Sequence, residues 1–324
     1  MKWRWHLCNT GYIYGSSSYG AIREATRALC IAECLHRMGE QVEIRSLPQS
    51  MPKKKPNRTK FFSHLFGASM SVPDIVVVEA EFFTFQNQKH RPRRSTLVGF
   101  KTSKALRDIE LLPKFQYLLA HEYKPNISSP KLIPLSYIVF DSLLDVFLDR
   151  GLLSAYLDND LAAIRDAFLT PHTGKVGFTG TALNGRSNLI NRLMRATQNA
   201  DLFDIRFTRG TGFPILYGSE YLEWLSGLAA GIHLAGDSPK ATRFAELALM
   251  GIPIVMVPCS MVEQPPVTKQ NTILLDNWKD AISLLDGLEQ TGSIQQAADE
   301  AYLSGWSPMG QAKQILKRVG SHGR

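Results

Sequence analysis

Apolar and polar positions alternate along the chain in a way that predicts strands and helices in regular succession. Residues 3–8 predict a strand, and the small-residue loop Asn9–Gly20 leads into a segment with apolar positions at helical spacing. That helix is expected to run to about Met38 and to stop at Gly39, because glycine readily adopts the conformation that ends helices. The next strand is predicted over residues 41–47. This succession is typical of a doubly wound α/β domain.

The same pattern returns in the second half of the chain. Buried strands are predicted at Asp74–Glu81 and Phe115–Ala120, and helical periodicity runs through residues 141–167. A further strand at Lys175–Phe178 leads through a small-residue loop ending at Arg186 into a helix. The repeat of strand, loop and helix predicts a second domain of the same class.

We therefore predict an α/β protein with two Rossmann-like doubly wound lobes that face a cleft. The predicted domains are a first lobe over residues 1–169 and a second lobe over residues 170–305. Residues 306–324 contain a last amphipathic helix, which is expected to pack back across the lobes. Ligands of such sheets bind at the carboxyl ends of the strands, so the loops after the strands are the candidate binding elements.

The loop after the first strand is rich in serine and tyrosine. It lacks G-x-G-x-x-G and also the G-x-x-x-x-G-K-[ST] phosphate loop. We interpret it as a wall of the ligand-binding cleft, with a purely structural turn as the alternative. Its candidate binding residues are Tyr14, Ser16, Ser17 and Tyr19.

The segment from Gly236 to Val255 carries the strongest chemical signal. It is predicted to be a polar loop, a helix, a glycine turn and a buried strand, with Lys240 and Arg243 near the start of the helix and Thr242 as its N-cap. Free backbone N–H groups and cations at a helix start favour a diphosphate. Glu246, about one turn further on, could accept hydrogen bonds from a ribose. The alternative is an ordinary αβ unit of a parallel sheet.

The residues Gly236-Asp-Ser-Pro, Arg243, Glu246 and Gly251-Ile-Pro-Ile-Val resemble the donor-site signature of exostosin-like glycosyltransferases. The resemblance covers roughly residues 175–280 and includes Tyr221 and Arg186. The chain departs from the signature in lacking a cysteine before Ile252 and in having Leu247 where the family has a small residue. The resemblance implies a nucleotide-diphosphate sugar as co-substrate and no other cofactor.

The resemblance also indicates the stereochemistry and the donor-binding residues. Retaining sugar transferases of this fold often have a second acid eight residues before the one that matches Glu246, and this chain has Ser238 there. We therefore expect inversion. The candidate donor-binding residues are Thr179, Gly180, Arg186, Gly236, Asp237, Lys240, Thr242, Arg243 and Glu246.

A metal ion is not expected in this site. Asp158-Asn-Asp160 matches the D-x-D pattern of metal-binding transferases, but it directly precedes a helical segment, where an aspartate N-cap is the better account. Lys240, Arg243 and Arg186 would then neutralise the leaving diphosphate. Removal of Arg243 is expected to abolish transfer with little change in the melting temperature.

Inverting transfer needs a base that takes the proton from the acceptor hydroxyl. The first lobe is then the acceptor-binding lobe, with its serine- and tyrosine-rich loop as a wall of the acceptor site. It offers acids and a histidine at the carboxyl ends of its strands. In order of preference the candidates are Glu122, His121, Glu81 and Glu79. A satisfied histidine at the rim and solvated glutamates are the alternative interpretation.

Composition sets limits on the whole chain. Its 324 residues, 44% of them hydrophobic, are enough for two cores, and no run of eighteen apolar residues suggests a membrane span. The amino-terminal residues lack a secretory apolar core, so a cytoplasmic location is expected. Cys30 and Cys34 lie one helical turn apart, and two buried thiols are a better account of them than a metal site.

The formal charge of +8 is concentrated in the first half, at Lys53–Lys60 and Lys89–Arg94 with Lys101 and Lys104. Solvated loops, an anionic acceptor and peripheral contact with an anionic membrane all fit this pattern.

Three functions follow as hypotheses. The leading one is transfer of a sugar to a polysaccharide, glycolipid or other glycan. The second is transfer to hydroxylated bases in DNA, and the third is a non-catalytic module that binds nucleotide or polyanion.

Overall fold

The structure is a computed structural model. It describes residues 1–7, 19–46, 61–66, 70, 72–79, 95–100, 113–120, 129–136, 138–139, 141–180, 185–207, 216, 218–234, 242–258 and 265–320, without the side chains of 19–25, 46, 79, 141–142 and 242. The chain divides into two compact units. The first comprises Met1–Ser136 and Gly305–Arg324, and the second comprises Tyr137–Ser260 and Pro265–Ser304.

The second unit begins earlier than the boundary expected near residue 170. Three short helices, α3 (Asp141–Asp149), α4 (Leu153–Asp158) and α5 (Leu161–Asp166), occupy the segment with helical periodicity and belong to this unit. Two ion pairs link this segment to the rest of the second unit: Arg150 pairs with Glu223, and Arg165 pairs with Asp299. The contact partners of this segment therefore lie on helices that are far from it in sequence. The pattern of apolar positions does not reveal such contacts.

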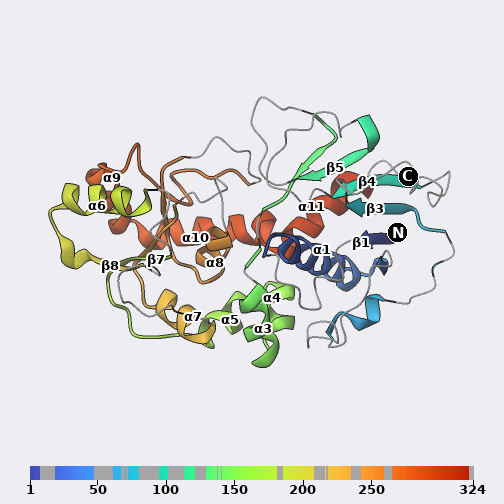
Figure 1. Cartoon of the computed structure of the whole chain (residues 1–324), viewed down its shortest axis with the longest axis horizontal. Coiled ribbons are helices and arrows are strands. Elements are labelled where there is room, and N and C mark those ends of the chain that lie inside the picture. Colours follow the sequence, from blue (N-terminus) through green and yellow to red (C-terminus); the bar gives the residue numbers. More distant parts are fainter. Residues whose placement is uncertain are drawn as a thin grey trace. The chain divides into compact units, whose positions relative to one another are not determined.

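The first unit contains a six-stranded parallel sheet (Figure 1). Its strands stand in the order β2-β1-β3-β4-β5-β6. They are β1 (Lys2–Leu7), β2 (Gln41–Ser46), β3 (Ile75–Glu79), β4 (Thr96–Phe100), β5 (Tyr117–Ala120) and β6 (Leu132–Pro134). The 3₁₀ turn η2 (Ser63–Leu65) follows β2 in the chain.

Two helices contact each other in this unit, α1 (Tyr19–Arg37) and α11 (Pro308–Gly320). Residues 28–35 of α1 are buried, and α1 contacts β1 and β2, where Trp3 and Trp5 are fully buried. Gly39 has φ +87° just beyond the helix, as the predicted stop requires. The carboxyl-terminal helix α11 contacts α1 and β6, so it packs on the first unit.

Strand β4 has no counterpart among the predicted strands. It contains Gly99, and a Cβ atom there would lie 2.9 Å from side-chain atoms of Leu118 and Phe115. The glycine makes room for these neighbours, and glycine lowers the strand signal of a short segment.

The second unit contains a five-stranded parallel sheet in the order β11-β10-β9-β7-β8. Its strands are β7 (Val176–Gly180), β8 (Phe203–Phe207), β9 (Ala230–Ile232), β10 (Ile254–Met256) and β11 (Ile273–Leu274). Besides α3–α5, its helices are α6 (Arg186–Thr197), α7 (Gly218–Ser226), α8 (Thr242–Leu249), α9 (Ala281–Glu289) and α10 (Thr291–Ala301), with the 3₁₀ turn η6 (Ala200–Leu202). The π-helical turn η7 (Tyr302–Trp306) connects α10 to α11.

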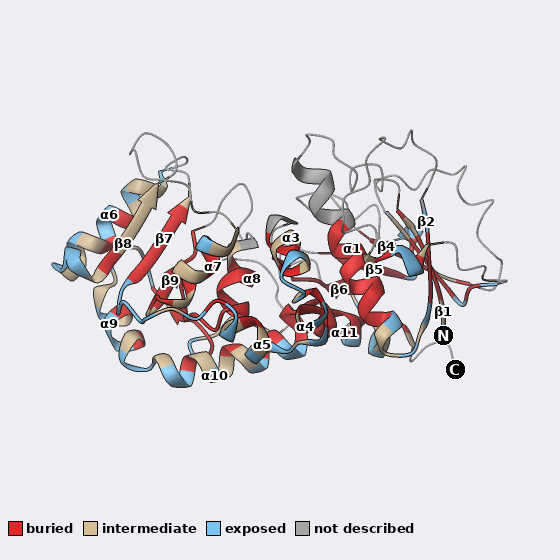
Figure 2. Ribbon diagram, turned by 90° about the horizontal axis from the view of Figure 1, so that it is seen from below, coloured by how far each residue is buried: buried red, intermediate tan, exposed pale blue. Residues whose placement is uncertain are grey.

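The core of the second unit lies on the central strands. Strands β7 and β9 and helix α8 are buried, whereas the edge strand β8 is mostly half-buried (Figure 2). Leu247 of α8 packs directly over Gly231 of β9, because a Cβ atom on Gly231 would lie 2.2 Å from a Leu247 methyl carbon. The large residue at position 247 is therefore compensated by a glycine on the strand beneath it.

Replacing Gly231 with alanine is expected to destabilise the second unit by about 1–3 kcal/mol, because the new methyl group overpacks this contact. Chemical denaturation measures the loss. The double variant Gly231→Ala/Leu247→Ala should lose less stability than the sum of the losses in the two single variants, and additive losses would contradict the packing argument.

Among the described residues, no helix has the length and apolar character needed to cross a bilayer.

Candidate functional site

The second sheet has a topological switch point between β7 and β9. From β7 the chain continues to β8 on one side, while β9, β10 and β11 extend the sheet on the other side. In open parallel sheets the loops diverge at such a point and leave a crevice at the carboxyl ends of the two strands. Here those ends are Gly180 on β7 and Ile232 on β9.

Arg243 lies at the carboxyl end of β7. It is the second residue of α8, and its Nη1 donates a hydrogen bond to the carbonyl oxygen of Thr179. The guanidinium carbon is 5.6 Å from the ring centroid of Phe178 and 5.4 Å from that of Tyr221. Only 23% of the Arg243 side chain is exposed, so the cation is held against the end of the strand and does not extend into solvent.

Glu246 is the carboxylate next to this cation. Its Oε2 accepts a hydrogen bond of 2.7 Å from the hydroxyl of Tyr221 and lies 3.9 Å from Nε of Arg243. Burial raises the pKa of Tyr221 well above its usual value, Arg243 opposes the shift, and Glu246 adds to it. Tyr221 therefore stays protonated and acts as the donor. We call Tyr221, Arg243 and Glu246 the switch-point triad.

The other described donor candidates lie on the β7–α6 connection. Thr179 and Gly180 form the end of β7, and Gly180 leaves room for the Phe178 ring, since a Cβ atom there would be 3.1 Å from Cζ. Arg186 is the first residue of α6, preceded by Gly185 with φ +72°. Thr242 is the first residue of α8, one position inside the N-cap position predicted for it, and its side chain is not described.

The remaining predicted residues do not have a described side chain. Tyr19 begins α1 and Glu79 ends β3. Outside the described residues are Tyr14, Ser16, Ser17, Glu81, His121, Glu122, Gly236, Asp237 and Lys240. Their roles stay predictions.

The D-x-D segment has the capping role predicted for it. The carboxylate of Asp160 accepts a hydrogen bond from the backbone N–H of Ala163 and is the N-cap of α5. Asp158 accepts one from the hydroxyl of Ser154. Within the described part of the chain, no three histidine, cysteine or acidic residues are grouped so that they could hold a metal ion. Cys30 and Cys34 are both buried, in agreement with the expected buried thiols.

A second arginine–carboxylate pair, on β8, did not emerge from the sequence. Arg206 makes two hydrogen bonds of 2.8 and 3.0 Å with Asp204, and Asp204 also accepts one of 2.7 Å from Nε1 of Trp224. Trp224 stacks on Tyr221 of the triad. The sequence did contain one signal for this group: Tyr221 and Trp224 are three residues apart on one helix, and residues at that spacing share a helix face.

His233 is the other residue that sequence reasoning missed. It directly follows β9, is 2% exposed and contacts the Phe244 ring edge-on at 5.8 Å. The pairing of Gly177 with Gly231, continued along both strands, sets His233 level with Thr179. A buried histidine thus lies under the first turn of α8 at the switch point.

Asp204 gives the unit a defined response to acid. Burial alone would raise its pKa, but the hydrogen bonds from Arg206 and Trp224 outweigh burial and lower the pKa from 3.8. A lowered folded-state pKa contributes stability above about pH 4 that is lost as the pH falls through the folded value. We expect Asp204→Asn to flatten the fall in unfolding free energy between about pH 5 and pH 2, measured by urea denaturation. An identical fall in the native chain and the variant would contradict this assignment.

Comparisons with known proteins bear on the fold. No protein-family model matches this sequence, and no curated protein matches it. Among solved structures, the chain is similar to a glycosyltransferase from Rickettsia africae, with 11% identity, a TM-score of 0.58, and coverage of 98% of this chain and 97% of that one. It is also similar to sucrose-phosphate synthase from Thermosynechococcus elongatus, with 10% identity, a TM-score of 0.51 and 99% coverage of both chains.

These likenesses extend over nearly the whole chain, and both units have the expected parallel sheets with helices. The protein therefore has the two-unit α/β fold of GT-B glycosyltransferases, as predicted from its sequence.

Proposed function

We propose that the protein transfers a sugar from a nucleotide-diphosphate sugar to a hydroxyl group of a glycan or glycolipid acceptor. The observation that supports this most is the position of the switch-point triad. Arg243 lies at the carboxyl end of β7, where open parallel sheets bind ligands, and at the first turn of α8, whose backbone N–H groups favour anions.

Each member of the triad has a distinct chemical role in this proposal. Arg243 stabilises the negative charge that develops on the leaving diphosphate, which is where a fixed cation lowers the barrier. Glu246 fixes the orientation of Arg243 and accepts hydrogen bonds from the donor ribose. Tyr221 holds the Glu246 carboxylate in place through its 2.7 Å hydrogen bond.

The finer features of the reaction are part of the same proposal. Arg243 with Lys240 and Arg186 would replace a divalent metal ion, so transfer is metal-independent. Ser238 in place of the second acid of retaining enzymes supports inversion. The base is proposed to be Glu122, with His121 and Glu81 as alternatives, and an alanine scan of the three ranks them.

The test is an assay of nucleotide release. The native chain is incubated with UDP-, GDP- and ADP-linked sugars, with and without EDTA, and the free nucleoside diphosphate is measured. We expect slow release from one nucleotide class that EDTA does not change. Loss of release with EDTA would contradict metal independence, and absence of both release and binding with every donor would overturn the proposed function.

A thermal-shift measurement with the same nucleotides, beside the release assay, separates the alternatives. Stabilisation by a nucleotide without release would identify a non-catalytic binding module. A nucleic-acid acceptor stays a sequence-based hypothesis, because the basic segments Lys53–Lys60 and Lys89–Arg94 lie outside the described residues. It predicts that affinity for DNA falls steeply with salt.

A further inference from the structure

Helices α7 and α8 end against the same short stretch of chain. Residues 165–173, which we call the capping strap, run from the last turn of α5 to just before β7. Helix α7 carries Tyr221 and helix α8 carries Arg243 and Glu246, so the strap contacts both helices of the switch-point triad.

The strap caps α8 through Arg165. Its Nε donates a 2.9 Å hydrogen bond to the carbonyl oxygen of Leu249, and Nη2 lies 3.3 Å from that of Ala248. The last carbonyls of a helix have no partner within the helix, and an arginine there also complements the helix dipole. Two further hydrogen bonds of 2.6 and 2.8 Å to Asp299 of α10 fix the orientation of the guanidinium.

The turn after α8 is shaped around this arginine. Gly251 has φ +70°, and a Cβ atom there would lie 2.7 Å from Cζ of Arg165. Helix α8 has only two turns, so its length is about 12 Å. A fixed carboxyl end therefore fixes the position of Arg243 at the other end.

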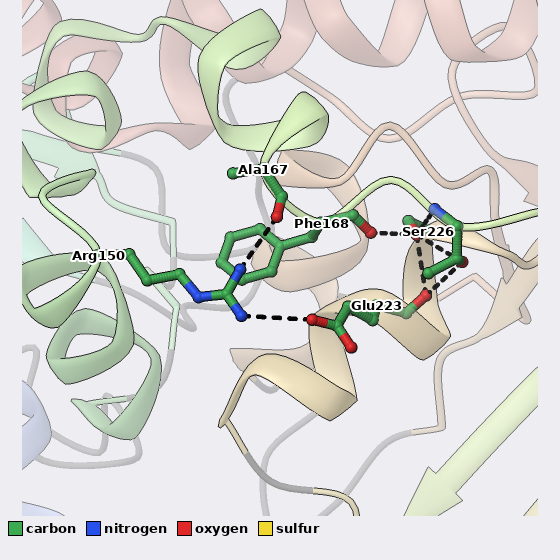
Figure 3. A network of polar contacts seen from close by, with 6 residues as sticks. Arg150, Ala167, Phe168, Glu223 and Ser226 are labelled. Carbon is green, nitrogen blue, oxygen red and sulfur yellow. Dashed lines mark hydrogen bonds and ion pairs between the residues drawn. The ribbon is translucent and has the colours of Figure 1, made fainter.

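The strap caps α7 through threonines and a serine. Oγ1 of Thr170 donates a 2.8 Å hydrogen bond to the carbonyl oxygen of Glu223, and both the backbone N–H and Oγ1 of Thr173 donate to that of Gly227. In return, the hydroxyl of Ser226 donates to the carbonyl oxygen of Phe168 at 2.6 Å (Figure 3). The contact is close, because a Cβ atom on Gly227 would lie 3.1 Å from Oγ1 of Thr170.

Arg150 adds a third attachment. Figure 3 shows its guanidinium between the Ala167 carbonyl oxygen, at 3.0 Å, and the carboxylate of Glu223, at 3.3 Å. Its Cζ is 4.6 Å from the Phe168 ring centroid. Hydrogen bonds from both backbone and side-chain groups thus link the strap to α7.

We infer that the capping strap is a positioning element that sets the spacing of α7 and α8, and through it the contact between Tyr221 and the Glu246–Arg243 pair. Arg165 and Thr170 are its positioning residues. This inference rests on the proposed function for its effect on donor binding, but the spacing itself is a property of the second unit that can be measured without any donor.

The first test measures binding of the nucleoside diphosphate that stabilises the native chain most. Arg165→Met should weaken binding at least about fivefold, and Thr170→Val about two- to threefold, whereas Thr170→Ser keeps the hydroxyl and should bind like the native chain. Asp280→Ala is the matched control, because it removes the N-cap of α9 and lowers stability without touching α7 or α8. Native affinity in both Arg165→Met and Thr170→Val would overturn the inference.

The second test needs no donor. It compares the unfolding constants of Thr170→Val, Glu246→Gln and the double variant. If the strap positions the triad, the factor by which Glu246→Gln changes the unfolding constant should be at least about fivefold smaller in the Thr170→Val background than in the native chain. Additive effects within twofold would overturn the inference even if the native chain binds donor. Failure of the native chain to bind any nucleotide would instead overturn the proposed function, and this cycle would still decide on the strap.

Discussion

Replacing Arg243 with methionine is expected to reduce the rate of sugar transfer by about a hundredfold to a thousandfold. The guanidinium stands at the carboxyl end of β7, bonded to the carbonyl oxygen of Thr179, and a fixed donor of this kind stabilises charge that develops during reaction. Methionine keeps the length and apolar stem of the side chain, so the loss reports mainly on the cation. Steady-state transfer with a saturating donor measures it.

Arg206→Met is the matched control for this prediction. Arg206 also pairs with a carboxylate, Asp204, and its Cζ also lies 5.4 Å from an aromatic ring centroid in the same unit. It differs in lying on the edge strand β8. We expect Arg206→Met to retain transfer within about threefold. Equal losses in the two variants would mean that general damage to the unit, and not the cation at the switch point, explains the effect.

The second large effect concerns stability. Arg243→Met removes the cation beside Glu246, whose side chain is 5% exposed, and breaking a buried pair in this way costs about 3 kcal/mol. For a unit of this size, that corresponds to a fall in melting temperature of roughly 6–12 °C. The sequence alone predicted little change in the melt, because it did not reveal that Arg243 points inward against a buried carboxylate.

A double variant separates stability from function at this pair. Arg243→Met/Glu246→Leu removes both charges, so it should melt several degrees above Arg243→Met, since the buried carboxylate is removed together with the cation beside it. Transfer should stay as low as in the single variant. A double variant that melts below both single variants would show that the two side chains do not form a coupled pair.

Much of the fold could be predicted from the sequence because both units repeat one local pattern. Strand, small-residue loop and helix announce a parallel sheet, and the glycines at 39 and 251 end helices through their positive φ. Strand β4 was missed because it contains Gly99, which makes room for neighbouring side chains but weakens the strand pattern. The edge strand β8 has only 5 residues, so the alternation of Asp204 and Arg206 with apolar residues is too short to stand out.

The chemistry of the site was predictable where it is local in sequence. Arg243 and Glu246 are three residues apart on one helix, so helix geometry places them on the same face, although it does not reveal that the carboxylate is buried. The contact of Tyr221 with Glu246 joins two helices that are separated in sequence by β9, and no pattern of spacing predicts it. The capping strap lies still further from α8 in the chain, which explains why Arg165 carried no signal.

The central claim is that the carboxyl ends of β7 and β9 bind a nucleoside diphosphate through Arg243. Isothermal titration of the native chain and Arg243→Met with UDP, GDP and ADP tests it most directly. The account predicts that the native chain binds one of these nucleotides and that Arg243→Met binds it at least about a hundredfold more weakly. Equal affinity of the two proteins for that nucleotide, or no binding by the native chain, would contradict the claim.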